Sequence, residues 1–167
     1  MKNTERSGGC FSPSRWNIYH ETEIQAPIQD VWDQLIDIGN WEWNKWTKLE
    51  AEEASAGTCG TLQASYNGDD NWESFDFTFG EVNSETYVLN WFGKIGFGTI
   101  FSGDHTMRLE EGPDANTTTL IHSENFGGLL PALGLGLPYS LLDRNYLLMN
   151  EALKEYVEGN STSTKTT

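Results

Sequence analysis

The sequence predicts an α+β domain in which one curved antiparallel sheet packs against a long C-terminal helix. The first indication is a run of short segments in which apolar and polar side chains alternate, separated by turn residues, as in an antiparallel meander. The second is an amphipathic segment from about Pro138 to Glu158. The third is that all three histidines lie on the apolar faces of strand-like segments.

The N-terminal part predicts one strand followed by a short helix. Apolar residues alternate over residues 16–24, which indicates the first strand. Pro27 suits the first position of a helix, where its missing N–H is not needed. Apolar residues at helical spacing then predict an amphipathic helix that ends near Gly39. These residues are Ile28, Val31, Trp32 and Leu35.

The middle of the chain predicts a series of strands with short connections. Alternation recurs at residues 62–66, 75–79 and 87–91. Two histidine-bearing strands follow at residues 105–109 and 120–126, and the turn between them contains Gly and Pro. Successive strands with short turns favour antiparallel pairing of neighbours.

The last element is a helix with one apolar stripe. The stripe consists of Leu142, Tyr146, Met149, Leu153 and Tyr156, opposite Glu151, Lys154, Glu155 and Glu158. Such a helix buries its apolar face on another element, and the sheet is the only large surface that the sequence offers. A sheet that grips one long helix leaves space between the two, which predicts an internal cavity.

Length and composition indicate one domain with polar ends. We expect a flexible leader over residues 1–14, a single domain over residues 15–158 and a disordered tail over residues 159–167. Aromatic residues make up 13% of the chain, and they supply rigid apolar walls for a core or a cavity.

The charge of the chain excludes several classes of partner. A net charge of -15 repels phosphate backbones and anionic lipid headgroups, so neither nucleic acid nor a membrane surface is an expected partner.

No apolar run is long enough for a membrane-spanning helix, and the first residues show no secretory signal. Cys10 and Cys59 are interpreted as free thiols. These features predict a cytoplasmic protein. We expect it to be a monomer or a homodimer.

Two groups of motifs resemble a known superfamily. The first motif, Ile24-x-Ala26-Pro27-x-x-x-Val31-Trp32, resembles the opening of START-like (SRPBCC) domains. The strand motifs around the histidines, in their order and spacing, resemble the polyketide cyclase/dehydrase-like branch of that superfamily. The likeness covers roughly residues 16–158.

This resemblance implies a helix-grip fold, with seven antiparallel strands, two short helices after the first strand and a long C-terminal helix over a hydrophobic cavity. The superfamily includes aromatase/cyclases, plant-hormone receptors and lipid-transfer domains. It therefore indicates the fold much better than the activity.

Three residues are candidates for catalysis. His122 and Glu124 are two apart on one strand, so their side chains project to the same side, and His105 lies on the strand expected to pair with theirs. An imidazole and a carboxylate at such range can share a proton and act as general acid and base. Burial raises the pKa of a glutamate and lowers that of a histidine. This chemistry suits enolisation, aldol-type ring closure or dehydration of a carbonyl-rich substrate.

Other residues are candidates for the lining of the cavity. They are Phe75, Phe77, Leu89, Trp91, Met107, Tyr146 and His20. The alternative for the apolar members is plain core packing, and the alternative for His20 is a structural role. The alternative for the three catalytic candidates is hydrogen-bonded packing around water or backbone groups. Tyr146 differs from the apolar residues because a buried phenol needs a partner and can donate to a ligand carbonyl.

We expect no metal and no cofactor. Two histidines and a carboxylate resemble the facial triad of mononuclear iron sites. However, the sequence has no Cys/His set for an iron–sulfur centre, no phosphate-binding loop and no CxxC motif.

The leading hypothesis is an enzyme that binds a small hydrophobic molecule, polyketide-like or aromatic, and promotes its cyclisation or dehydration by general acid/base catalysis. The first alternative is a carrier or sensor of a hydrophobic ligand without turnover. The second is a protein-interaction module that meets a basic partner through its acidic surface and exposed Trp41, Trp43 and Trp46.

Overall fold

The computed structural model describes residues 17–95, 100–132 and 138–163. Its strands are β1 (Asn17–Ile24), β2 (Thr47–Ala51), β3 (Cys59–Ala64), β4 (Glu73–Asn83), β5 (Val88–Ile95), β6 (Phe101–Glu111) and β7 (Thr118–Gly127). Its helices are α1 (Ile28–Ile36), the 3-10 helix η1 (Ile38–Asn40), α2 (Leu129–Ala132) and α3 (Tyr139–Ser163). The predicted elements follow the expected order, but β2 and α2 were not predicted from the residues.

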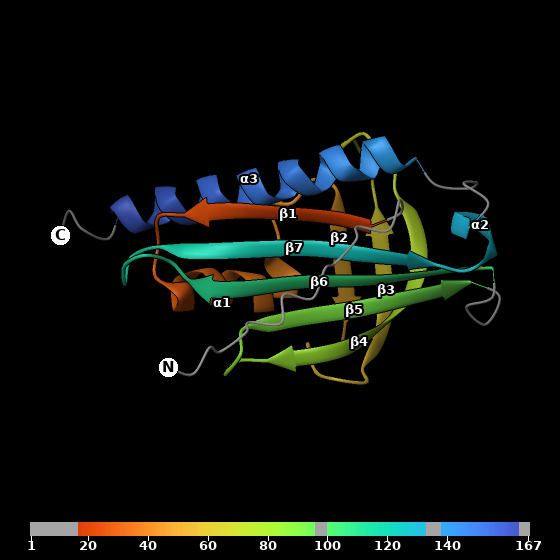
Figure 1. Cartoon of the computed structure of the whole chain (residues 1–167), viewed down its shortest axis with the longest axis horizontal. Coiled ribbons are helices and arrows are strands. Elements are labelled where there is room, and N and C mark those ends of the chain that lie inside the picture. Colours follow the sequence, from red (N-terminus) through yellow and green to blue (C-terminus); the bar gives the residue numbers. More distant parts are fainter. Residues whose placement is uncertain (1–16, 96–99, 133–137, 164–167) are drawn as a thin grey trace, which may run out of the picture.

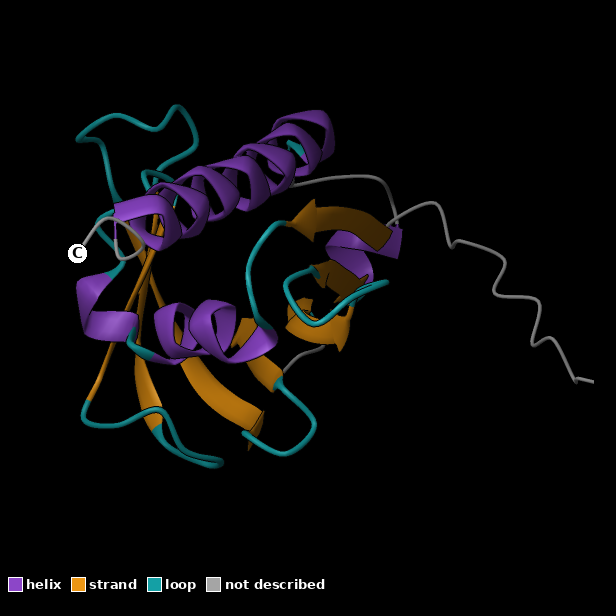
Figure 2. Ribbon diagram, turned by 90° about the vertical axis from the view of Figure 1, so that its left-hand side faces the viewer, coloured by secondary structure: helices purple, strands orange, loops and turns teal. Residues whose placement is uncertain are grey.

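The described strands form one antiparallel sheet in the order β1-β7-β6-β5-β4-β3-β2. Consecutive strands are neighbours from β2 to β7, and β1 pairs with β7 at one edge. In Figure 1, β1 and β7 lie side by side next to α3, which packs mainly against β1. Figure 2 shows the strands curving around α1 and α3. The predicted fold class is confirmed.

The inner face of α3 is built as the amphipathic pattern predicts, with one exception. Met149 and Leu153 are fully buried and Tyr146 is nearly so. Tyr156, expected on the same stripe, is 36% exposed, whereas Val157 is buried. At 3.6 residues per turn, position 156 lies about 60° to one side of Leu153, whereas position 157 lies about 40° to the other side, close to fully buried Asn150.

The boundaries of the helices differ slightly from those expected. Pro27 is the N-cap of α1 and not its first residue, a shift within the usual uncertainty of helix ends. The last helix continues to Ser163, beyond the expected end at Glu158. Gly159 does not take the positive φ of a helix-ending glycine, so the backbone continues as a helix through the start of the predicted tail. The expected leader lies outside the described residues.

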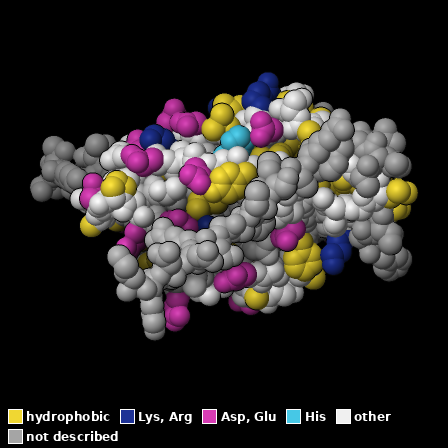
Figure 3. Space-filling view, viewed as in Figure 1, with side chains coloured by type: hydrophobic (Ala, Val, Ile, Leu, Met, Phe, Trp, Pro, Cys, Tyr) yellow, Lys and Arg dark blue, Asp and Glu magenta, His cyan; other side chains and the backbone are white. Residues whose placement is uncertain are grey.

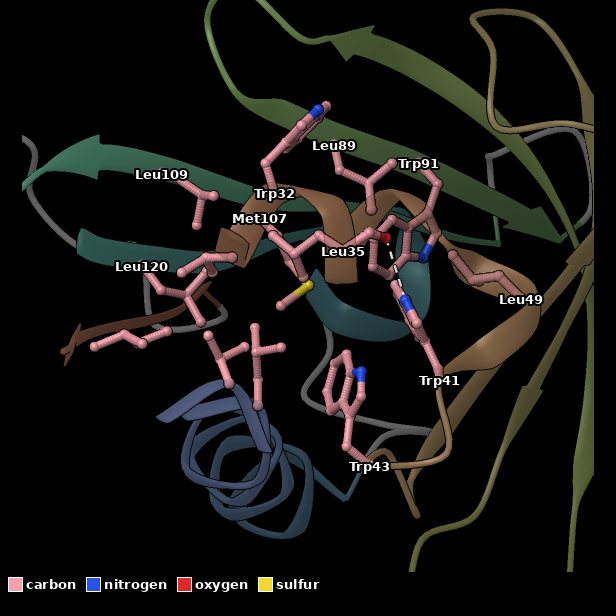
Figure 4. Packing of buried hydrophobic residues seen from close by; sticks show 14 of the residues in the cluster. Trp32, Leu35, Trp41, Trp43, Leu49, Leu89, Trp91, Met107, Leu109 and Leu120 are labelled. Atoms are coloured by element: carbon pink, nitrogen blue, oxygen red, sulfur yellow. Dashed lines mark hydrogen bonds between the residues drawn. The ribbon is translucent and has the colours of Figure 1, made fainter. Parts of the chain in front are cut away.

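A large apolar cluster fills the space between the sheet and α1 (Figure 4). The labelled members are Trp32, Leu35, Trp41, Trp43, Leu49, Leu89, Trp91, Met107, Leu109 and Leu120. The Trp41 indole N–H donates to the Leu35 carbonyl over 3.1 Å, which ties the segment after α1 to that helix. Trp41 and Trp43 are buried, so the exposed tryptophans that the interaction-module hypothesis requires are not found at these two positions.

The surface is strongly acidic, in keeping with the net charge of -15. Figure 3 shows acidic side chains distributed over the visible face, with few Lys or Arg side chains among them. Among the described helices, none combines the length and the apolar content that crossing a membrane requires.

Candidate functional site

A cavity of about 620 Å³ lies between the sheet and the N-terminal half of α3. This volume is within the range of sites that hold small organic molecules. The lining is largely apolar and aromatic, with a few polar side chains. Its main apolar members are Leu62, Phe75, Phe77, Trp91, Phe101, Phe126, Leu130 and Leu142.

The register of the sheet explains why the cavity lies there. Phe77 on β4 is opposite Gly93 on β5, Gly93 is opposite Gly103 on β6, and Gly103 is opposite Phe126 on β7. Two adjacent glycines therefore leave part of the concave face without side chains. A Cβ added at Gly93 meets only the carbonyl oxygen of Asp76, at 3.4 Å, so the space above it is open.

The row of residues next to these glycines contains two of the three catalytic candidates. Trp91 is opposite His105, and His105 is opposite Glu124. His122 lies one row further from the cavity, opposite Met107 on β6. Across β6 and β7, His105 is therefore directly opposite Glu124 and diagonal to His122.

Glu124 is held by one oxygen and extends the other over a glycine. Its Oε2 accepts a hydrogen bond from the Tyr146 hydroxyl and lies 3.5 Å from His105 Nδ1. Its Oε1 lies over Gly103, where an added Cβ would be only 2.5 Å away. Gly103 thus provides the room in which the carboxyl group sits at the edge of the cavity.

The two histidines are fixed by hydrogen bonds and ring contacts. His105 Nε2 lies 2.7 Å from His122 Nε2, and His122 Nδ1 lies 2.6 Å from the Asn150 side-chain carbonyl oxygen on α3. Trp91 stacks on His105 with ring centroids 4.0 Å apart, and Tyr146 stacks on His122 at 4.7 Å. Rotation of either imidazole would break these contacts.

Burial sets the ionisation of the whole group. It raises the pKa of Glu124 to about 7, although the Tyr146 hydrogen bond and nearby His122 lower it. Burial lowers the pKa of His105 to about 3 and that of His122 well below its usual value. It also raises the pKa of Tyr146 well above 10.0. The lowered pKa values keep both histidines neutral near neutral pH, and among these groups Glu124 has the pKa closest to that pH.

The raised pKa of Glu124 predicts a specific pH dependence of stability. Because the folded-state pKa is about 7 and the ordinary value is 4.5, the unfolded chain loses this proton first as the pH rises. The free energy of unfolding therefore falls as the pH rises from about 4.5 to about 7, and it falls no further at higher pH. We expect wild type to lose roughly 2 kcal/mol relative to Glu124→Gln between about pH 5.5 and about pH 8.

Urea unfolding of both proteins at the two pH values measures this difference. The two histidines act in the opposite direction, because their folded pKa values are lowered and their stability contribution is lost as the pH falls below 6.5. Both proteins carry them, so we expect their effect to cancel in the comparison. A stability difference that does not change with pH would contradict the raised pKa.

Several of the predicted site residues line the cavity together. They are Glu124, His105, Trp91, Phe75, Phe77 and Tyr146. As the described residues define it, the lining does not include His122, which lies behind His105 and contacts it.

Three other predicted residues lie elsewhere. Leu89 and Met107 are fully buried in the apolar cluster, one row from the cavity lining. His20 turns to α3, where its Nε2 lies 2.9 Å from the Asp143 carboxylate and 3.1 Å from the Asp143 carbonyl oxygen. All three lie on the same face of the sheet as the residues that line the cavity. The apolar cluster separates Leu89 and Met107 from the cavity, and His20 contacts Asp143 of α3.

Two contributors to the site were not singled out from the sequence. Asn150 is fully buried and lies on the apolar stripe of α3, where a polar residue is itself an indication of a specific partner. Gly103 interrupts a strand pattern, which indicates a close approach of another group. Both features were visible in the sequence, but their partners depend on the strand register and on the placement of α3.

No protein-family model and no curated protein matches the sequence. Solved structures do match the fold. The Thermus thermophilus protein TTHA0849 superposes with a TM-score of 0.66 at 19% identity, covering 87% of this chain and 99% of that one. The chain has the helix-grip fold.

Two further solved structures are similar to this chain in fold. An aromatase/cyclase, ZhuI, from a Streptomyces species has a TM-score of 0.65 at 18% identity, over 85% of this chain and 93% of that one. Ara h 8.0201 has a TM-score of 0.61 at 16% identity, over 84% and 96% of the two chains. At such identities the likeness establishes the fold and not the activity.

Proposed function

We propose that this protein binds a small, largely apolar molecule in the cavity and promotes its cyclisation or dehydration by general acid/base catalysis. The observation that carries this proposal is Glu124, a buried carboxyl at the edge of an apolar cavity whose pKa is raised to about 7. A general acid/base is most effective when its pKa is near the working pH. The fold shared with an aromatase/cyclase supports a polyketide-like or aromatic substrate.

Glu124 performs both proton transfers of a ring closure. As a carboxylate it removes a proton from the carbon between two carbonyl groups and leaves an enolate. The enolate carbon then bonds to a second carbonyl carbon, and the oxygen of that carbonyl takes the proton back from the Glu124 acid. Loss of water repeats the cycle: the carboxylate removes an α proton and the acid protonates the departing hydroxyl.

The other polar residues support this carboxyl. Tyr146 donates to Oε2, which leaves Oε1 as the oxygen over the glycine floor of the cavity. The pKa of His105 is lowered by burial to about 3, so the ring is neutral and contributes hydrogen bonds rather than charge. Trp91 holds the His105 ring in place by stacking. The apolar lining keeps water away from the reacting atoms.

Filling the cavity at Gly93 tests whether it is the binding site. Gly93→Leu places a side chain over open space on β5, beside Gly103, and no Glu124 atom lies within 4 Å of the added Cβ. We expect it to weaken the binding of 2-naphthol, a bicyclic phenol whose fluorescence reports binding, by about tenfold or more, equivalent to about 1.4 kcal/mol. Gly39→Leu, the same change at an exposed glycine with open surroundings, is expected to leave binding unchanged.

Equal affinity in Gly93→Leu and wild type would place the 2-naphthol site outside this cavity. Binding that depends on Gly93, together with no acceleration of α-proton exchange on a bound ketone, would instead identify the protein as a carrier.

A further inference from the structure

A continuous series of buried polar groups leads from Glu124 away from the cavity to α3. It runs from Glu124 through His105 and His122 to Asn150, whose side-chain N–H donates to Thr22 Oγ1 over 3.2 Å. His122 and Asn150 are fully buried, and both lie behind the cavity lining. Substrate in the cavity therefore does not touch Asn150.

The hydrogen bonds of this series have one direction. The Asn150 carbonyl oxygen faces His122 Nδ1, and a carbonyl oxygen only accepts, so Nδ1 carries the proton. A neutral imidazole has one N–H, so His122 Nε2 is an acceptor and the proton in the 2.7 Å contact belongs to His105 Nε2. His105 Nδ1 then presents a lone pair to Glu124 Oε2 across 3.5 Å, a contact longer than the two hydrogen bonds of the series.

The opposite direction would have the opposite effect on the carboxyl group. If an N–H of the Asn150 amide faced His122 Nδ1, each proton in the series would move to the other partner, and His105 Nδ1–H would point at Glu124. An N–H directed at Oε2 stabilises the carboxylate, whereas a lone pair directed at Oε2 stabilises the acid.

We propose that Asn150 is a positioning residue, which fixes the ring protons of His122 and His105 so that His105 Nδ1 presents a lone pair, and not an N–H, to the Glu124 carboxyl. This assignment deepens the proposed function, because it concerns the acid form of the same carboxyl. It also assigns His122 a defined task although His122 lies outside the cavity lining. The two imidazoles transmit the orientation of one amide on α3 to the carboxyl at the cavity.

Several groups influence Glu124, and only the two histidines among them depend on the orientation of Asn150. The titratable or charged groups that act on it from the surrounding elements are Tyr139 and Tyr146 of α3, Tyr66 after β3, Asp104 and His105 of β6, and His122 of β7. Among these, the two histidines are the links through which Asn150 acts.

The ring ¹⁵N chemical shifts of the histidines in wild type test this assignment directly. At about pH 6 we expect His122 to carry its proton on Nδ1, a form that is uncommon for histidine in water, and His105 to carry its proton on Nε2. A spectrum with His122 protonated on Nε2 and His105 on Nδ1 would overturn the proposal. This measurement needs no substrate, so its outcome is independent of whether the protein is an enzyme.

Asn150→Leu tests the effect on the carboxyl. Without the amide carbonyl, we expect the proton of His122 to move to Nε2 and that of His105 to Nδ1, so that the apparent pKa of Glu124 falls by about one unit or more. Leu153→Ala, which creates a cavity in the same face of α3 without touching the series, is the control for general destabilisation. It should leave the ring protons and the pKa unchanged.

A purely structural role of Asn150 gives a different result. Both variants would then lose stability while the ¹⁵N shifts and the Glu124 titration remain those of wild type, and the proposal would be wrong. If Asn150→Leu does not fold, the wild-type spectrum still decides between the two directions.

Discussion

Glu124→Gln is expected to slow proton exchange at the α carbon of 2-tetralone by about two to four orders of magnitude. This bicyclic aromatic ketone has an acidic α proton and a size suited to the cavity of about 620 Å³. Glutamine keeps the shape of the side chain but has no proton to accept or return. Affinity for the ketone is expected to change little, so the loss appears in turnover rather than in binding.

Nuclear magnetic resonance of the ketone in deuterated water follows this exchange. Because a carboxylate is the base, the wild-type rate is expected to rise with pH and level off above about 7, in line with the raised pKa of Glu124. Glu110→Gln, the same change at an exposed position of β6, is the matched control and should exchange at the wild-type rate. An unchanged rate in Glu124→Gln would remove Glu124 from the mechanism.

Leu153→Asp is expected to prevent stable folding. Leu153 is fully buried on the inner face of α3, and the described residues that cluster with it are apolar, so they offer a carboxylate no positive partner. Burying an unpaired charge costs several kcal/mol, which is a large part of the roughly 5–15 kcal/mol that stabilises a typical domain. Circular dichroism and thermal unfolding measure the loss.

Leu147→Asp is the matched control for this change. Leu147 lies on the same helix but is 42% exposed, so the same substitution is expected to change stability by no more than about 0.5 kcal/mol. A folded Leu153→Asp variant with an unchanged melting temperature would show that α3 does not close the sheet in solution.

Much of the fold could be predicted from periodicity, because each strand or helix carries its own pattern of buried and exposed residues. Alternation gave the histidine-bearing strands β6 and β7, and a 3.6-residue pattern gave the buried face of α3. Tyr156 and the end of α3 were less predictable. The exposure of Tyr156 depends on a small angular offset around the helix, and the end of α3 depends on the φ of Gly159. The apolar pattern alone encodes neither of these.

The site was only partly predictable because a period of two gives the face of a strand and not the position along that face. Leu89, Met107 and Trp91 share the concave face, but α1 and the segment after it pack over the first two, and only Trp91 reaches the cavity. The position of the cavity depends on the register that places Gly93 beside Gly103. Such pairings between distant segments are not visible in one sequence.

The most direct test of the proposed role of Glu124 is the titration of this carboxyl itself. The titration is followed by the carboxyl ¹³C resonance in protein labelled at glutamate, and the resonance is assigned by its absence in Glu124→Gln. We expect an apparent pKa near 7 in the free protein and a change of this resonance when 2-naphthol binds, because the carboxyl lies at the edge of the cavity. A pKa near the ordinary 4.5, with no response to the bound molecule, would contradict this role.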